Sequence, residues 1–353
     1  MSARTIVIGA GGTAGHVVPA LAVADALRAQ GAEVVFIGGE RAELELVPAA
    51  GYELRRLRVL SLPRRSPLRA LRAAALDARA VGAATRMLRR LVPAAVLGAG
   101  GYVAGPVGLA ALSRRVPLVL MEADSHLGLT NRLLAPAAQR VCLAFPLPDR
   151  DSNRYLVTGR PVPPPASDRA AARARFGIAE QETFVLVFGG SLGARSINHA
   201  AVEAFAHSPF RVLHAAGERD LPDLRSPGPH YDLRGYLAHF GQALLASDLV
   251  VSRAGGSVFE IAAHGRPAVL IPYPHATADH QTTNARYFER AGAAVVIPDA
   301  ELTAPRLRDE VQRLLSDPAR LAAMGRAASE LARPDAAQAV AREVLAAAAM
   351  RRQ

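Results

Sequence analysis

Residues 9–24 read GAGGTAGHVVPALAVA and directly follow the apolar run Ile6-Val7-Ile8. An apolar strand, a glycine-rich turn and a helix together form a phosphate cradle, because glycines let the backbone approach a ligand and a helix N-terminus attracts anions. The stretch therefore predicts the first strand and helix of a Rossmann-like domain. His16 stands where this helix begins. Two interpretations are open for it: a loop histidine without chemistry, or a group placed to act on a ligand.

The alternation of strand and helix continues along the chain. Short β-branched runs alternate with alanine-rich helical stretches such as 19–30 and 104–113, which is typical of a parallel sheet covered by helices on both faces. The proline-rich residues 158–169, TGRPVPPPASDR, suit a stiff connection, and a second strand, glycine loop (GGSLGARSIN, 189–198) and helix follow it. We therefore expect an α/β protein of two Rossmann-like domains, 1–160 and 161–335, with the active site in the interdomain cleft at the carboxyl ends of both sheets. Strands are expected at residues 5–9, 33–38, 94–98, 116–121 and 140–145, and at 183–188, 210–215, 249–252, 268–272 and 293–297.

The composition restricts both the partners and the chemistry. The formal net charge of +11 favours an acidic partner, such as phosphate groups, anionic lipid or nucleic acid. All of the Lys and Arg positions are arginine, which excludes a Walker-type phosphate loop and lysine Schiff-base chemistry. The single cysteine, Cys142, excludes a disulfide framework and a thiolate metal site. Since neither a signal-peptide pattern nor an apolar run of about 20 residues occurs, we expect a cytoplasmic protein, soluble or peripheral.

The most informative stretch of the second half is 252–285, SRAGGSVFEIAAHGRPAVLIPYPHATADHQTTNA. Gly255 and Gly256 let backbone amides approach a ligand, and Ser257 begins a helix whose N-terminus can bind an anion. Glu260 follows one turn later. The spacing Ser257-x-x-Glu260 is also that of a capping box, in which the glutamate only satisfies its own helix. Both interpretations are open from the local sequence.

Two weaker signals point to other classes of site. The first loop fits the dinucleotide fingerprint if Ala14 is accepted at its last position, and Glu40 stands where a ribose-binding acid would be. A nicotinamide oxidoreductase is therefore an alternative, although it explains little of the second half. Asp149 and Asp151 are spaced like metal ligands, but their Pro- and Arg-rich surroundings favour a solvated turn.

Six segments together resemble a known family. They are GGTAGHVVPALAVA, GAGGYVAGP, MEADSHLGLTNR, TGRPV, FGGSLGARSIN and the stretch 252–285 quoted above, and they occur in the family's order across nearly the whole chain. The family is that of the UDP-N-acetylglucosamine transferases that act on the undecaprenyl-diphosphate-linked muramyl-pentapeptide of peptidoglycan synthesis. The resemblance implies a two-domain glycosyltransferase fold (GT-B), inverting transfer without cofactor or metal, and a last helix, around 336–351, that returns onto the first domain. A UDP-N-acetylglucosamine 2-epimerase, which can share this fold, is the related alternative.

The resemblance also implies that the C-terminal domain holds UDP. Glu260 is then expected to accept hydrogen bonds from the ribose hydroxyls, Leu237 to offer its backbone to uracil, and Gln281 to contact the N-acetylglucosamine. The helix start at 256–259 would stabilise the charge that develops on the diphosphate. The implied donor-binding residues are Thr13, Ala14, Gly15, Asp124, Arg160, Ser191, Leu237, Gly256, Ser257, Val258, Phe259, Glu260 and Gln281.

An inverting transfer gives His16 a role. The attacking hydroxyl loses a proton as the new bond forms, so a base with a pKa near neutrality assists. His16 is the candidate base and Glu122 the alternative. The implied acceptor-binding residues are Thr13, His16, Tyr102 and Glu122.

Four positions differ from the family's pattern. Ala14 replaces a glycine, Asp124 stands in place of an asparagine that contacts the donor, and Leu192 replaces a common glutamine. Pro163 takes the place of an arginine, whose charge we expect the nearby Arg160 to supply.

The polyprenyl chain of the implied acceptor stays in the bilayer, so the enzyme must come to it. Residues 62–91, LPRRSPLRALRAAALDARAVGAATRMLRRL, interleave arginines with apolar residues, and ALSRRVP at 111–117 repeats the pattern. We expect peripheral docking on the anionic cytoplasmic face of the membrane and no nucleic-acid partner. The ordinary alternative is alanine-rich core helices with solvated arginines. The residues concerned are Arg64, Arg65, Arg69, Arg72, Arg79, Arg86, Arg89, Arg90, Arg114 and Arg115, with Leu68, Leu71, Leu76, Met87, Leu88 and Leu112.

Overall fold

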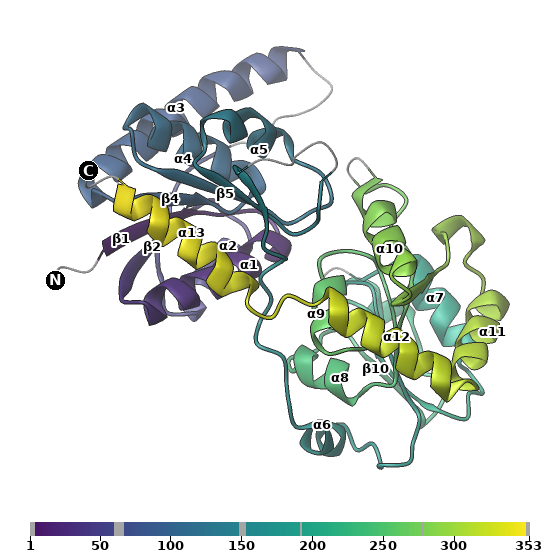
Figure 1. Ribbon diagram of the computed structural model, residues 1–353. Helices are drawn as coiled ribbons and strands as arrows, with labels where there is room; N and C mark the ends of the chain where they lie inside the picture. Colours follow the sequence, from purple (N-terminus) through teal and green to yellow (C-terminus); the bar gives the residue numbers. More distant parts are fainter. Residues whose placement is uncertain (1–3, 60–66, 148–152, 191–192, 277–278, 351–353) are drawn as a thin grey trace. The chain divides into compact units, whose positions relative to one another are not determined.

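The chain forms two compact α/β units in a computed structural model that describes residues 4–59, 67–147, 153–190, 193–276 and 279–350, with the backbone alone for 67–77 (Figure 1). Unit 1 comprises Met1–Pro163 and Arg333–Gln353, and unit 2 comprises Pro164–Ala332. Each unit contains one parallel sheet, so the predicted fold class is confirmed.

Unit 1 is built on a seven-stranded parallel sheet of order β3-β2-β1-β4-β5-β6-β7. The central strands carry the apolar runs that predicted them, and Ile6, Val7 and Ile8 are fully buried. The strands are β1 (Arg4–Gly9), β2 (Ala32–Gly38), β3 (Glu53–Arg56), β4 (Ala95–Gly98), β5 (Leu118–Glu122), β6 (Arg140–Leu143) and β7 (Tyr155–Val157). The helices are α1 (Ala14–Ala29), α2 (Glu43–Ala49), α3 (Pro67–Leu91), α4 (Gly101–Ser113), α5 (Leu129–Leu134), the 3₁₀ turn η1 (Ala135–Ala137) and α13 (Ala336–Met350).

The helix α13 belongs to unit 1, although the whole of unit 2 precedes it in the sequence. Figure 1 shows it beside α1. Val340 and Val344 are fully buried in the same apolar cluster as Val23 of α1. An ion pair of 3.1 Å between Arg140 and Glu343 joins this helix to β6.

Unit 2 is built on a six-stranded parallel sheet of order β10-β9-β8-β11-β12-β13. Its strands are β8 (Phe184–Phe188), β9 (Arg211–Ala215), β10 (Tyr231–Arg234), β11 (Leu249–Ser252), β12 (Ala268–Leu270) and β13 (Ala294–Val296). Its helices are α6 (Arg169–Arg175), α7 (Arg195–Ala204), α8 (Phe240–Ala246), α9 (Val258–Ala263), α10 (His280–Arg290), α11 (Ala304–Leu315) and α12 (Pro318–Leu331), with the 3₁₀ turns η2 (Leu221–Asp223) and η4 (Asp299–Glu301).

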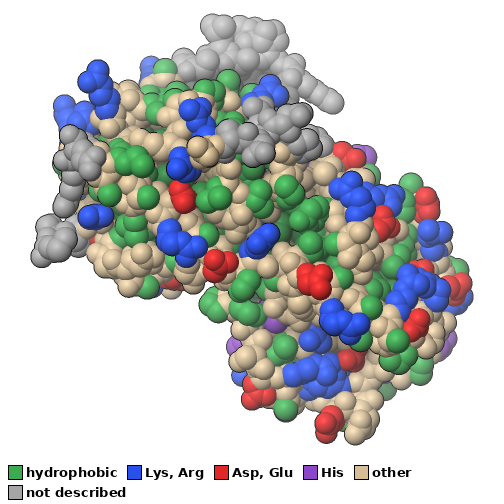
Figure 2. Space-filling view, viewed as in Figure 1, with side chains coloured by type: hydrophobic (Ala, Val, Ile, Leu, Met, Phe, Trp, Pro, Cys, Tyr) green, Lys and Arg blue, Asp and Glu red, His purple; other side chains and the backbone are tan. Residues whose placement is uncertain are grey.

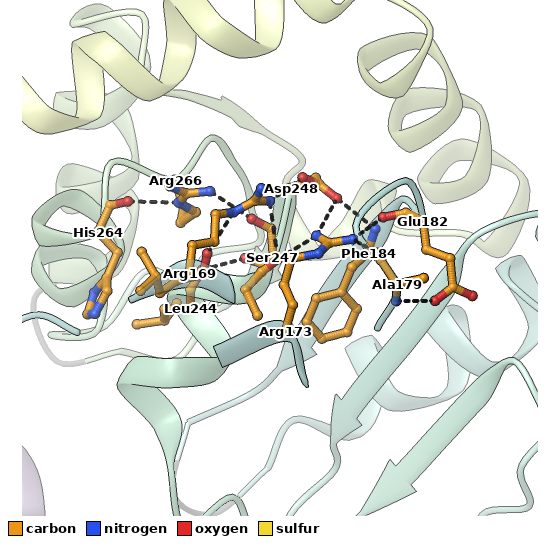
Figure 3. A network of polar contacts seen from close by, with 12 residues as sticks. Arg169, Arg173, Ala179, Glu182, Phe184, Leu244, Ser247, Asp248, His264 and Arg266 are labelled. Carbon is orange, nitrogen blue, oxygen red and sulfur yellow. Dashed lines mark hydrogen bonds and ion pairs between the residues drawn. The ribbon is translucent and has the colours of Figure 1, made fainter. Parts of the chain in front are cut away.

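An arginine network fixes α6 at the amino-terminal ends of β8 and β11 (Figure 3). The Asp248 carboxylate accepts from Arg169 at 2.6 Å and from the Phe184 amide at 2.8 Å, and Arg173 donates to the carbonyl of Ala246. Arg266 donates to the Ser247 carbonyl at 2.9 Å. Because ligands of such sheets bind at the carboxyl ends of the strands, this network is a structural support.

The differences from the predicted elements have local causes. Strands β3, β7 and β10 were not predicted because they lie at sheet edges and lack the buried apolar run that marks the edge strand β13; β3, for example, exposes Glu53 and both of its arginines. Helix α1 begins at Ala14 and contains Pro19, so the predicted start at Pro19 is wrong. Helix α4 likewise begins at Gly101, three residues earlier than predicted.

Candidate functional site

Two glycine-rich turns meet at the carboxyl edge of the unit 1 sheet. A Cβ atom built on Gly101 would lie 1.7 Å from the carbonyl oxygen of Gly11, and one built on Gly100 would lie 2.7 Å from His16 Cδ2. Both Gly100 and Gly101 also have positive φ, 89° and 75°. The turn after β1 and the turn after β4 therefore pack backbone to backbone, and side chains at these positions would separate them.

His16 lies in the first turn of α1, against the backbone of Gly100. Its Nδ1 atom is 3.5 Å from the Thr13 hydroxyl, and its ring is half-buried. Thr13 and Gly15 are exposed, and Ala14 is half-buried. The structure thus brings Thr13, Ala14, Gly15 and His16 to one helix N-terminus.

Glu122 is buried at the end of β5. Its carboxylate accepts hydrogen bonds from the amides of Asp124 (3.2 Å) and Gly128 (2.9 Å) and from the Asn131 side chain (2.9 Å). Burial raises the pKa of this carboxyl, while the bonds from Gly128 and Asn131 oppose the rise. These contacts show Glu122 holding the loop 123–128, in which Asp124 is half-buried.

Arg160 is also buried in unit 1. Its guanidinium donates to the carbonyl oxygens of Ala123 at 2.8 Å and Gly15 at 2.5 Å. The predicted donor-binding arginine therefore joins the two turns that carry His16 and Glu122.

In unit 2 five of the predicted donor residues, 256–260, follow β11. Ser257 precedes α9 and makes no side-chain cap hydrogen bond, so the Ser257 half of the predicted capping box does not form. The side chains of Val258 and Phe259 are buried, and their amides donate to Gly255 and Gly256 at 3.2 and 3.3 Å. Gly256, Ser257 and Glu260 are half-buried.

Side chains of helix α10 lie against the start of this loop. Gln281 accepts from the Tyr273 amide at 3.0 Å, and its Nε2 would lie 3.7 Å from a Cβ built on Gly255. Asn284 donates to the Ala254 carbonyl at 3.1 Å, and its buried Oδ1 has no hydrogen-bond partner in the described part of the chain. Leu237 is buried in the turn after β10. Ser191 and Leu192 lie outside the described residues.

Sequence reasoning missed a buried arginine in unit 2. Arg253 donates to Asp299 at 2.5 Å, to the Ser196 hydroxyl at 2.8 Å and to the carbonyls of Ile271 and Pro272 at 3.2 Å. It thereby links the segments that follow β8, β11, β12 and β13. Arg253 lies in the SRAGG segment that the sequence analysis singled out, but no local sequence pattern predicts partners so distant in the chain.

The predicted membrane segment requires a correction. Leu88 is buried in the core, and Met87 and Leu112 pack against it, so these three apolar residues do not form a docking surface. Arg79, Arg86, Arg89, Arg90, Arg114 and Arg115 are exposed, whereas the side chains of Arg64, Arg65, Leu68, Arg69, Leu71, Arg72 and Leu76 lie outside the description.

Exposed leucines that were not predicted lie on α4 and α5, namely Leu109, Leu129 and Leu133. On the face drawn in Figure 2, unit 1 shows arginines scattered among apolar side chains, while acidic and basic side chains lie next to each other on unit 2. No helix within the described ranges is both long and apolar enough to cross a bilayer. Asp149 and Asp151 lie outside these ranges, within which no cluster of three or more His, Cys, Asp or Glu could hold a metal.

The comparison with known proteins covers both units. Residues 6–143 match the glycosyltransferase family 28 N-terminal domain, and residues 184–340 match the C-terminal domain of that family. The chain is 28% identical to the crystal structure of MurG from Acinetobacter baumannii, with a TM-score of 0.79 over 97% of this chain and 99% of that one.

Two curated relatives have the same name, "UDP-N-acetylglucosamine--N-acetylmuramyl-(pentapeptide) pyrophosphoryl-undecaprenol N-acetylglucosamine transferase". The protein of Moorella thermoacetica is 41% identical, over 96% of this chain and 98% of its own. That of Alkalilimnicola ehrlichii is 45% identical, over 96% and 97%. With such identity along its length, the chain belongs to this family of N-acetylglucosamine transferases.

Proposed function

We propose that this chain transfers N-acetylglucosamine, with inversion, from UDP-N-acetylglucosamine to the muramyl 4-hydroxyl of undecaprenyl-diphosphate-linked MurNAc-pentapeptide. This reaction converts lipid I to lipid II in peptidoglycan synthesis. The observation that carries the proposal is the identity of 41% and 45% to transferases of that name, over 96% of the chain. Both glycine-rich turns lie within the matched domains.

Unit 2 is proposed to bind the donor. Glu260 and Gln281 flank the Gly255-Gly256 turn at the carboxyl ends of the strands, where parallel sheets bind nucleotides. In this proposal the Glu260 carboxylate accepts from the ribose hydroxyls, Leu237 meets uracil through its backbone, and Gln281 contacts the sugar. The start of α9 and Ser191 stabilise the diphosphate as it gains charge.

Unit 1 is proposed to supply the acceptor side. The muramyl hydroxyl attacks C1 of the sugar, the C1–O bond to UDP breaks, and UDP leaves with the bonding electron pair. His16 takes the hydroxyl proton. Its half-buried ring at a helix N-terminus supports this role more directly than Glu122, whose carboxylate is buried and already accepts three hydrogen bonds. Tyr102 and Thr13 are proposed to line the acceptor-binding side of the site.

We place the reaction at the cytoplasmic face of the membrane, with the protein bound peripherally. The net charge of +11, the exposed arginines of α3 and the exposed leucines Leu109 and Leu133 support this proposal. Arginines around apolar side chains suit an anionic lipid surface.

One assay tests the proposed reaction. Radiolabelled UDP-N-acetylglucosamine is incubated with the lipid-linked acceptor, and we expect label in the lipid product with one UDP released per transfer. Calorimetric titration should show binding of UDP and UDP-N-acetylglucosamine and no binding of NAD. Free or epimerised sugar without acceptor would instead identify a 2-epimerase, and binding of NAD without UDP an oxidoreductase; either result would overturn the proposal.

A further inference from the structure

A buried carboxylate lies beneath the turn that carries His16. Glu43, the first residue of α2, is fully buried. Its Oε2 accepts from the Gly12 amide at 2.9 Å, and its Oε1 accepts from the Gly39 amide at 2.8 Å and from the Tyr102 hydroxyl at 3.0 Å. Burial of a carboxylate costs free energy unless the group is hydrogen-bonded. The segments that donate these hydrogen bonds therefore indicate what Glu43 does.

The bonds of Glu43 join separate segments of unit 1. Gly12 precedes Thr13, the N-cap residue of α1; Gly39 follows β2; and Tyr102 lies in the first turn of α4. The Tyr102 hydroxyl also accepts from the amide of Glu40 at 3.1 Å. One side chain thus fixes the turns after β1 and β2 to the start of α4.

The surrounding glycines leave room for these two side chains. A Cβ built on Gly39 would lie 1.9 Å from the Tyr102 hydroxyl oxygen, and one on Gly11 would lie 2.9 Å from Glu43 Oε1. The turn at Gly11 and Gly12 therefore does more than let a phosphate approach the backbone: it also makes room for the Glu43 carboxylate and donates a hydrogen bond to it. Only glycine fits the close contact at Gly39 without displacing the tyrosine.

We infer that Glu43 is a positioning residue for the transfer, acting through the Gly12 amide and the Tyr102 hydroxyl to set the turn that presents Thr13 and His16. This inference rests on the proposed function. The Tyr102 proton is donated to Glu43, so the acceptor can meet this residue only through its ring or its remaining lone pair. Misplacement of a catalytic group by about 1 Å costs on the order of 100-fold in rate.

The test uses the full chain and four single variants. Glu43→Gln keeps the shape but sets an NH2 group against a backbone N–H, and Tyr102→Phe removes the hydroxyl. Glu45→Gln changes an exposed glutamate on the same helix, and Val47→Ala removes buried apolar volume from that helix while it leaves the hydrogen-bonding groups of Glu43 unchanged. We expect Glu43→Gln to lower kcat roughly 10- to 100-fold while the Kd for UDP stays within about two-fold.

The double variant Glu43→Gln/Tyr102→Phe should lose less activity than the two single losses multiplied, because both act through one network. Equal kcat losses in Val47→Ala and Glu43→Gln, at matched Tm, would reduce Glu43 to a stability role. So would a kcat of Glu43→Gln that equals that of Glu45→Gln.

A second measurement does not depend on activity. Hydrogen exchange of peptides covering residues 10–17 should be at least about tenfold faster in Glu43→Gln than in Glu45→Gln, since the Gly12 amide loses its acceptor. Unchanged exchange overturns the inference even if the wild type proves inactive. A wild type that transfers no sugar, with exchange responding as expected, overturns the proposed function alone.

Discussion

Arg160 supplies a donor that Pro19 cannot. Its Nη2 lies 2.5 Å from the carbonyl oxygen of Gly15, four residues before Pro19 in α1. Within an α-helix the residue at position 19 would donate to that carbonyl, but proline has no N–H. The guanidinium takes this place and reaches Ala123 with its other nitrogen, so the N-terminal turn of α1 is secured by a residue far away in the sequence.

Substitution of Arg160 should separate positioning from donor binding. Lysine cannot make both bonds in the fork geometry of arginine, so we expect Arg160→Lys and Arg160→Gln to lower Tm and to reduce kcat at least about tenfold. The Kd for UDP, measured by calorimetry, should stay within about two-fold. A Kd for UDP weakened tenfold with an unchanged Tm would show instead that Arg160 binds the donor.

Loss of the proposed base should affect turnover alone. His16→Ala should reduce kcat by about 10²- to 10⁴-fold, the usual contribution of a positioned acid or base. UDP affinity should be unaltered, because the donor is proposed to bind unit 2. Glu122→Gln, assayed in parallel, should lower Tm as well, since its carboxylate holds the loop 123–128. Activity within a few-fold of wild type in His16→Ala would transfer the base role to Glu122.

Substitution of Glu260 distinguishes a donor contact from a helix cap. Glu260→Ala should weaken UDP-N-acetylglucosamine binding by roughly 1.5–3 kcal/mol, the contribution of hydrogen bonds to a charged group. Because Ser257 makes no cap bond, Ser257→Ala should leave Tm near the wild-type value. Glu330→Ala, at an exposed position of unit 2, is the control. A lower Tm with unchanged donor affinity would refute the ribose contact.

His214 should make unit 2 sensitive to acid. Burial lowers the pKa of His214 to about 4, and its nitrogens pair with Tyr231 (2.7 Å) and Asn198 (3.0 Å). Between about pH 6.5 and 4 the unfolded chain binds a proton that the folded chain does not, so stability falls as pH falls through this window and is fully present above it.

The contribution amounts to about 3 kcal/mol. Unfolding free energies between pH 7 and 4 should therefore depend less on pH in His214→Gln than in wild type. The exposed His207→Gln should keep the wild-type slope. Parallel curves for all three proteins would contradict the prediction.

Membrane binding should depend on charge location, not on net charge alone. The double variant Arg86→Gln/Arg89→Gln should bind anionic vesicles roughly 30-fold more weakly, at about 1 kcal/mol for each near-surface charge. Arg308→Gln/Arg313→Gln removes the same charge from exposed positions of unit 2 and should bind normally. Sedimentation with increasing anionic lipid, at low and high salt, measures both. Equal loss in the two variants, or no loss, would remove α3 from the docking surface.

The central strands of both sheets could be predicted because their residues are apolar on both faces, as in Phe184–Phe188. The edge strand Glu53–Arg56 lacks this signal, since solvent covers most of it. Leu88 was wrongly assigned to a surface because neighbouring arginines masked its helical period; burial showed the true direction of its side chain.

The candidate site divides in the same way. Motifs and the family resemblance pointed to the glycine turns, His16 and Gln281, because these residues stand in distinctive stretches of the sequence. Glu43, Arg253 and the structural bonds of Arg160 could not be found from local pattern. The partners of these residues are distant in the sequence and are brought together by the sheet topology. A single charged residue in the polar first turn of a helix also gives no sequence signal that it is buried.

The position of α13 sets an order for biosynthesis. The helix completes the apolar cluster that also buries Val23 and Leu27 of α1, yet the ribosome makes it after all of unit 2. Domains fold as they emerge, so unit 2 has its whole core before unit 1 does. A nascent chain halted before residue 336 leaves the apolar face of α1 exposed to chaperones or to aggregation. A deletion at the C-terminus is therefore expected to destabilise unit 1.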